Sequence, residues 1–121
     1  MKLFINQESK IEDICKSFTA SYPFLKIELY KKPFAGSFKK ERLPFKQPLG
    51  QIINHDLKAT IVITAGTTVA ELEESFSSIG LQAEIFRRSG NVWVETSLTN
   101  NWSLYQQNCE GEEISRHFQS Q

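Results

Sequence analysis

Residues 60–97, TIVITAGTTVAELEESFSSIGLQAEIFRRSGNVWVETS, carry the clearest structural pattern in this chain of 121 residues. The β-branched run from Thr60 to Thr64 predicts a strand, and Gly66 ends it. Thr68 and Glu71 have the spacing of a capping box, in which two side chains satisfy free backbone N–H groups at the start of a helix. Apolar residues then follow on one helical stripe: Val69, Leu72, Phe76 and Ile79.

Gly80 supplies the left-handed residue that commonly ends a helix. Beyond it, residues 81–88 and 91–97 alternate like two strands, and Ser89-Gly90 predicts a two-residue hairpin loop between them. The stretch therefore predicts a strand, a helix and a β-hairpin in succession.

The first part of the chain has the same order of elements. Residues 3–5 predict a short strand, and Ser9 with Glu12 predicts a second capping box. Pro23 ends the helix, and residues 24–30 alternate as a half-buried strand. No sequence repeat beyond this shared order is evident.

The element order predicts an α+β fold in one domain spanning residues 1–121. Two β-α-β units favour a ferredoxin-like split βαβ arrangement, which is an antiparallel sheet with both helices on one face. The hairpin adds a strand, and Thr99 or Asn101 caps a short last helix over residues 102–109; residues 112–121 read as a polar tail. A different α+β sheet order is the alternative, because short strands do not decide it.

The composition is that of a globular protein, with 40% apolar and 23% charged residues and a formal net charge of zero. No run approaches the ~18 apolar residues of a membrane span, and the first residues do not resemble a signal peptide. Cys15 and Cys109 form no metal-binding or redox motif. We therefore expect a cytoplasmic protein, without a membrane partner, whose Cys15 is a buried thiol.

The pairing of residues across the predicted hairpin indicates which side chains lie on the face of the sheet away from the helices. A loop at Ser89-Gly90 places Phe86 opposite Trp93, and Glu84 opposite Glu95, on the face away from the helices. With Tyr30, Val62 and Arg88 as expected neighbours, this face predicts a surface for binding protein or for dimerisation. In the alternative interpretation, Trp102 and Leu104 of the last helix cover it.

The connection over residues 31–57 is long and begins with a basic stretch. Cations and phenylalanines alternate there, which is a mixture that single-stranded nucleic acid requires. The candidate polyanion-binding residues are Lys31, Lys32, Phe38, Lys39, Lys40, Arg42 and Lys46. The alternatives for this stretch are an anionic membrane surface, an acidic protein partner, or a solvated loop whose phenylalanines pack back onto the core. The strand at residues 60–64 has no aromatic residue, so the sequence lacks the stacking platform of an RNA-recognition module.

No catalytic residue, metal ligand set or cofactor motif emerges. Gly66-Thr67-Thr68 lacks the lysine and glycine spacing of a phosphate loop. Glu84 and Glu95 could form an acid/base pair, and with Arg88 they could line a pocket, but repelling surface carboxylates are the simpler interpretation.

The segment Phe86-Arg87-Arg88-Ser89-Gly90-Asn91-Val92-Trp93, followed by Trp102-Ser103-Leu104 and Gln107-Asn108, resembles a group of small bacterial proteins. Tyr22-Pro23-Phe24-Leu25-Lys26 is similar to their first half. The resemblance implies a bacterial, cytosolic protein, and it implies no activity. Together these observations predict a non-enzymatic protein-interaction module that binds through the Phe86/Trp93 face or an edge strand, with a second copy of the chain as one candidate partner. Nucleic-acid binding through residues 31–46 is the alternative.

Overall fold

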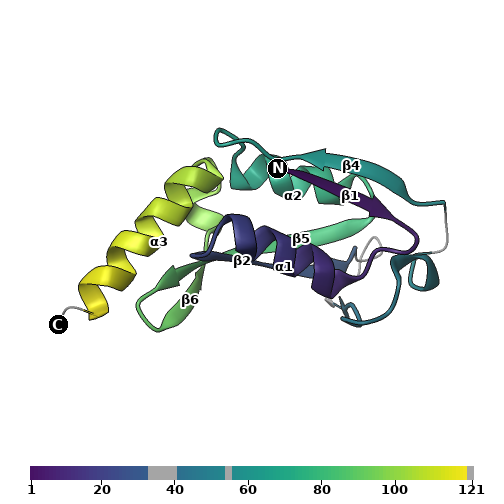
Figure 1. The fold of residues 1–121 in the computed structure, drawn as a ribbon. Coiled ribbons are helices and arrows are strands. Elements are labelled where there is room, and N and C mark those ends of the chain that lie inside the picture. The colour runs from purple at the N-terminus through teal and green to yellow at the C-terminus, as the bar shows by residue number, and fades with distance from the viewer. Residues whose placement is uncertain (33–40, 54–55, 120–121) are drawn as a thin grey trace.

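The computed structural model describes residues 1–32, 41–53 and 56–119 (Figure 1). The elements are β1 (Lys2–Asn6), α1 (Ile11–Ser21), β2 (Leu25–Lys31), β3 (Glu41–Arg42), the 3₁₀ turn η1 (Leu49–Gln51), β4 (Lys58–Val62), α2 (Val69–Ser77), β5 (Leu81–Ser89), β6 (Val92–Glu95), the 3₁₀ turn η2 (Ser97–Thr99) and α3 (Leu104–Gln119). None of the helices in the described part of the chain is long and apolar enough to cross a membrane.

The strands form two antiparallel sheets. β1 pairs with β4, and the other sheet has the order β3-β2-β5-β6. In a single ferredoxin-like sheet, β2 and β5 would flank the central pair of β1 and β4. Here β2 and β5 instead pair with each other, from Leu25 opposite Arg87 to Lys31 opposite Leu81. The α+β class and the antiparallel pairing are as predicted, but the single ferredoxin-like sheet does not form. An alternating pattern specifies which side chains are buried, and both arrangements satisfy it equally.

The helices α1 and α2 cover the same face of the four-stranded sheet. Thr19 Oγ1 donates to Leu25 O (3.2 Å) and Cys15 Sγ lies 3.4 Å from Ile27 O, so α1 sits along β2. The buried side chains of both sheets and both helices form one core cluster, in which Phe18 and Phe76 are fully buried. Within the described part of the chain, no helix lies on the opposite face of the four-stranded sheet (Figure 1).

The buried positions reveal a repeat that the sequence pattern alone did not. Five core positions recur 58 residues later: Leu3 and Ile61, Ile5 and Ile63, Ile11 and Val69, Ile14 and Leu72, Phe18 and Phe76. The turns after β1 and β4 follow the same spacing: Ser9 N donates to Asn6 O, and Thr67 N donates to Thr64 O, both at 3.1 Å. The units β1-α1-β2 and β4-α2-β5 are therefore structurally equivalent, and each strand pairs with its own counterpart.

The helix starts differ in how they are capped. At α2 the predicted capping box is confirmed, with Thr68 and Glu71 exchanging hydrogen bonds of 3.1 Å. The second box is not formed: α1 begins after Lys10 with no side-chain cap, and Ser9 Oγ accepts from Asn6 N instead. Neighbouring backbone replaces the cap, because Glu12 N donates to Phe45 O (3.1 Å).

The β5–β6 hairpin turns one residue later than predicted. Ser89 pairs with Val92, so the loop is Gly90-Asn91 and the register moves by two residues. Gly90 has φ 66°, as the first position of a II′ loop requires, and Ser89 would be strained there. Trp93 therefore lies opposite Arg88, and Phe86 lies opposite Glu95.

The C-terminal helix is longer than predicted. The expected polar tail from residue 112 onward continues α3 to Gln119, and Ser103, in place of Thr99 or Asn101, accepts a hydrogen bond from Gln106 N (3.0 Å) at its start. Gly111 allows α3 to approach β5 and Phe24 closely, since a Cβ at this position would lie 3.1 Å from both Arg88 O and Phe24 Cβ. Packing against the sheet thus stabilises a helix that its polar sequence does not predict.

Candidate functional site

The open face of the four-stranded sheet is the surface opposite α1 and α2. It is defined here by Lys26, Glu28 and Tyr30 of β2, Arg42 of β3, Gln82, Glu84, Phe86 and Arg88 of β5, and Trp93 and Glu95 of β6. Cross-strand pairs place them together, because partners in an antiparallel ladder share a face. The intervening residues of β2 and the first half of β5, such as Ile27 and Ile85, point into the core instead.

The aromatic residues of the open face are joined by cations. Lys26 Nζ lies 5.0 Å from the ring centroid of Phe86 and 5.4 Å from that of Trp93. The guanidinium of Arg88 lies 5.2 Å from the Trp93 centroid, and its Nε donates to Gly90 O (2.9 Å). All three distances to the ring centroids are within the range of cation–π attraction. The predicted pair Phe86 and Trp93 is therefore brought together through Lys26, although the two residues are not directly opposite.

The C-terminal helix does not cover these aromatics. Leu104 is fully buried in the core, and Trp102 lies with its ring 5.7 Å from the Arg87 guanidinium. Arg87 Nη1 also donates to Gln107 Oε1 (2.9 Å), and the side chain of Arg87 alternates with that of Arg88 along β5. α3 therefore packs on the helix side of the sheet.

Two further expectations were wrong: Val62 lies on β4 in the other sheet, and Glu84 lies opposite Glu28, not opposite Glu95.

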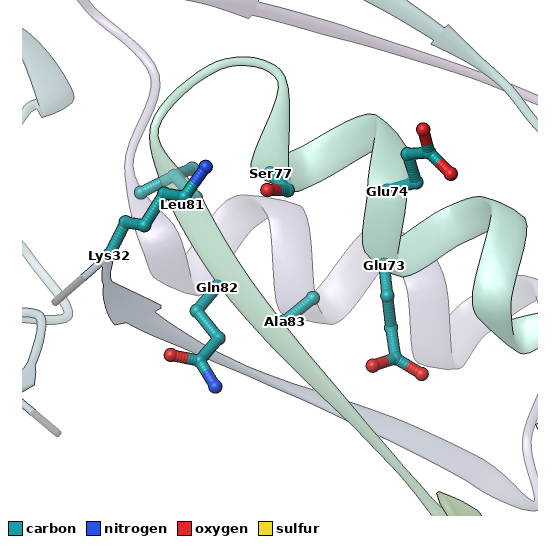
Figure 2. Close-up of a pocket in the computed structure, with 7 residues that line it drawn as sticks. All are labelled: Lys32, Glu73, Glu74, Ser77, Leu81, Gln82 and Ala83. Atoms are coloured by element: carbon teal, nitrogen blue, oxygen red, sulfur yellow. The ribbon is translucent and has the colours of Figure 1, made fainter. Parts of the chain in front are cut away.

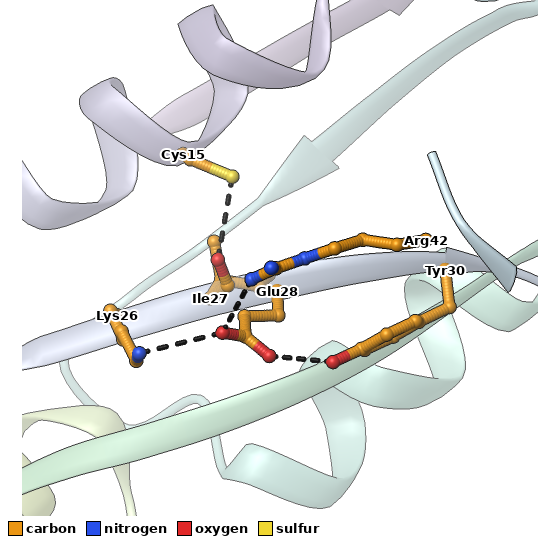
Figure 3. A network of polar contacts seen from close by, with 6 residues as sticks. All are labelled: Cys15, Lys26, Ile27, Glu28, Tyr30 and Arg42. Atoms are coloured by element: carbon orange, nitrogen blue, oxygen red, sulfur yellow. Dashed lines mark hydrogen bonds and ion pairs between the residues drawn. The ribbon is translucent and has the colours of Figure 1, made fainter. Parts of the chain in front are cut away.

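Glu28 organises a polar network at the centre of the open face (Figure 3). Its carboxylate accepts from Tyr30 Oη at 2.6 Å, and pairs with Arg42 at 2.8 Å and with Lys26 at 3.4 Å. Burial alone would raise the pKa of Glu28, but the Tyr30 hydrogen bond and the two cations outweigh it and lower the pKa. The same hydrogen bond, with burial and the charges of Glu28 and Glu84, raises the pKa of Tyr30 to about 12.

Cys15 lies on the other side of β2 from this network, as Figure 3 shows. Burial, with the Glu28 charge, raises the pKa of its thiol to about 11, so the thiol is protonated at neutral pH. It is half-buried, whereas Cys109 is exposed, and neither forms a disulfide. Cys15 therefore packs between α1 and β2 as a protonated thiol, with Sγ 3.4 Å from Ile27 O.

A cavity of about 510 Å³ lies between α2 and the first half of β5 (Figure 2). Its lining includes Glu73, Ser77 and Ala83. Glu73 and Ala83 also line a second cavity of about 190 Å³. Glu84 and Glu95 line that second cavity, but Arg88 does not, because its guanidinium lies on Trp93. Burial, with the charge of Glu84, raises the pKa of Glu73. Among the described residues no three His, Cys, Asp or Glu side chains lie close enough to hold a metal.

The basic stretch is described only at its ends. Phe38, Lys39 and Lys40 lie outside the described residues. Lys31, Lys32, Arg42 and Lys46 are exposed, and Arg42 forms its ion pair with Glu28. The connection also contains a short strand that was not predicted, β3, which pairs with β2. The same connection contains the 3₁₀ turn η1.

Two components of the open face were missed from sequence. Lys26 and Glu28 connect the aromatic and charged parts, and the alternation of residues 24–30 had already placed both on the same side as Tyr30. That signal was available, but an alternating charged residue is usually a solvated one.

No protein-family model, curated protein or solved structure matches this chain. The resemblance to a group of small bacterial proteins, the cytoplasmic location and the single-domain organisation remain predictions from sequence.

Proposed function

We propose that this chain is a non-enzymatic protein-interaction module that binds its partner through the open face. The observation that carries the proposal is that Phe86 and Trp93 lie half-buried on a sheet face with no described helix over it, where Lys26 and Arg88 hold them in place. Aromatic residues and arginine are enriched at the centres of protein interfaces, because they combine large area with few rotatable bonds.

The charge pattern favours a protein partner over a polyanion. The open face carries three cations, Lys26, Arg42 and Arg88, and three acids, Glu28, Glu84 and Glu95. A balanced, alternating pattern gives orientation and specificity against a complementary protein surface. A nucleic-acid surface would instead need a net excess of positive charge.

A second copy of the chain is the first partner to test. The mass in solution is measured by size-exclusion chromatography with light scattering for the wild type, for Trp93→Glu and for Arg88→Glu. Tyr105→Glu is the control, because Tyr105 is an exposed aromatic on α3. We expect the open-face variants to lose partner binding, while the control keeps it. Far-UV circular dichroism identifies a variant that has unfolded, and the Arg88 variant then serves as the test.

The outcomes separate the two functions. A loss of self-association in both open-face variants supports the proposal. A wild type that co-purifies with nucleic acid and releases it with rising salt would move the function to residues 31–46, and charge removal at Lys39 and Lys40 would then reduce the salt dependence. If both open-face variants fold and bind every partner of the wild type unchanged, the open face is not the site.

A further inference from the structure

β4 is an edge strand of the two-stranded sheet, and its backbone pairs with β1 on one side only. Met1 N donates to Ile63 O (2.7 Å) and Ile63 N donates to Met1 O (2.8 Å), so Met1 and Ile63 form a hydrogen-bonded pair. This pair shows which residues of β4 direct their backbone groups toward β1. In an antiparallel ladder, the residues between such pairs direct their N–H and C=O groups to the outer edge. Thr60 and Val62 therefore present their backbone groups away from β1.

Some edge carbonyls elsewhere in the sheets are satisfied locally. Thr19 Oγ1 donates to Leu25 O on β2, at a part of that strand which β3 does not reach. Ser9 N donates to Asn6 O at the end of β1. No described residue bonds to the outward backbone groups of Thr60 or Val62. An unpaired edge of this kind is a template for another strand.

The sequence of β4 has few of the features that normally protect an edge. Charged residues, prolines and bulges serve that purpose in native sheets; β4 has one charged residue, Lys58 at its start, and from Ala59 to Thr64 there is none. The side chains flanking the edge are accessible: Val62 is 55% exposed, and Phe4 on the adjacent strand is 71% exposed. The run is β-branched and uncharged, so it favours pairing with a strand of the same kind.

We propose that the β4 edges of two copies of this chain pair antiparallel about a twofold axis at Thr60. The pairing would join the two-stranded sheets into one four-stranded sheet of order β1-β4-β4-β1. The register follows from the alternation, since only outward-facing residues can pair across the axis: Thr60 faces its own equivalent, and Val62 faces Lys58 of the other copy. No like charges are opposed in this register, which is the condition for a self-complementary edge.

This inference goes beyond the proposed function of the open face, because β4 belongs to the other sheet. The two can be tested separately. Val62→Lys introduces a charge on the edge and opposes it to Lys58 of the second copy. Thr60→Pro removes the central outward donor, and an edge strand tolerates proline at a residue whose N–H faces solvent. Phe4→Lys is the matched control, since it adds the same charge to the same sheet surface but on β1.

Sedimentation velocity over a range of concentrations measures the dimer dissociation constant of each variant. We expect a wild-type dimer that Val62→Lys and Thr60→Pro each weaken by about tenfold or more, since like charges and a lost ladder bond both oppose pairing. Phe4→Lys leaves it unchanged. Adding Lys58→Glu to Val62→Lys restores the dimer, because opposite charges then face each other. Amide exchange of Thr60 and Val62 slows as dimer forms.

A wild type that is monomeric at every concentration overturns the inference. So does a dimer that both β4 variants leave intact. If Trp93→Glu dissociates the dimer and the β4 variants do not, the open face is the self-association surface, and the proposed function stands without the β4 pairing. A double variant that fails to regain the dimer overturns the register at Thr60.

Discussion

Gln107 gives the sharpest test of how α3 is held, and the expected effect can be worked out from its contacts. It is fully buried, and Nε2 donates to both Thr99 O and Thr99 Oγ1 at 2.8 Å, while Oε1 accepts from Arg87 Nη1 at 2.9 Å. Gln107→Met keeps the volume of the side chain and removes all three hydrogen bonds. It also leaves a partly buried guanidinium without its partner on α3.

The magnitude follows from the number and type of these bonds. A neutral hydrogen bond contributes roughly 1 kcal/mol net and one to a charged group roughly 1.5 to 3, so we expect a loss of about 2 to 4 kcal/mol after methionine packing is counted. For a chain of this size that lowers Tm by about 8 to 16 °C. Urea denaturation monitored by circular dichroism measures the change.

Gln106→Met is the control, because Gln106 is the exposed neighbour on the same helix turn. We expect the control to lie within about 0.5 kcal/mol of the wild type, as surface changes usually do. A Gln107→Met protein as stable as the control would refute the argument that this buried amide holds α3 on β5.

Three further predictions concern single sites. At pH 8 an alkylating reagent should modify exposed Cys109 rapidly and Cys15 only after unfolding, because the Cys15 thiol, with a pKa of about 11, is half-buried and protonated; mass spectrometry of peptides locates the label. Gly90→Ala should destabilise the fold by about 1 to 2 kcal/mol, since φ of 66° is strained for alanine, whereas Asn91→Ala should be nearly neutral in the same urea assay. In an alkaline absorbance titration, compared with that of Tyr30→Phe, Tyr30 should ionise with a pKa of about 12. Because folding raises this pKa, the contribution of Tyr30 to stability is complete below about pH 10 and is lost as the pH rises to 12. Ionisation of Tyr30 near pH 10 would contradict its hydrogen bond to Glu28.

Local features of the fold could be predicted from local sequence. The Thr68 cap and Gly80, with its φ of 87°, each depend on the conformational preferences of one or two residues. The open face could also be assigned although the hairpin register was wrong. A shift of two residues moves Phe86 relative to Trp93 but leaves both on the same face, because side chains alternate with a period of two.

The wrong predictions involve contacts between distant parts of the chain. Ser9 has the sequence of a helix cap, but its own C=O accepts from Leu49 N (2.8 Å), which pins the turn in another conformation. α3 continues beyond residue 109 because it packs against distant parts of the chain: Gly111 lies against Arg88 and Phe24, and Ser115 is buried. Sequence pattern does not identify such partners, for the same reason that it did not identify β5 as the neighbour of β2.

The equivalence of the two β-α-β units has a consequence for folding. The two long ladders, β1 with β4 and β2 with β5, both join one unit to the other, so each unit alone leaves its strands without their main partners. Such non-local pairing requires closure of large loops before it is stabilised, which predicts slow, cooperative folding. It also makes exchange of whole units between two chains a direct route to domain-swapped dimers, since the first unit of one chain meets in the second unit of another the same surfaces that it meets in its own. Refolding at high dilution should therefore give a single species, and refolding from concentrated denatured protein should trap exchanged pairs that return only slowly to the unexchanged form.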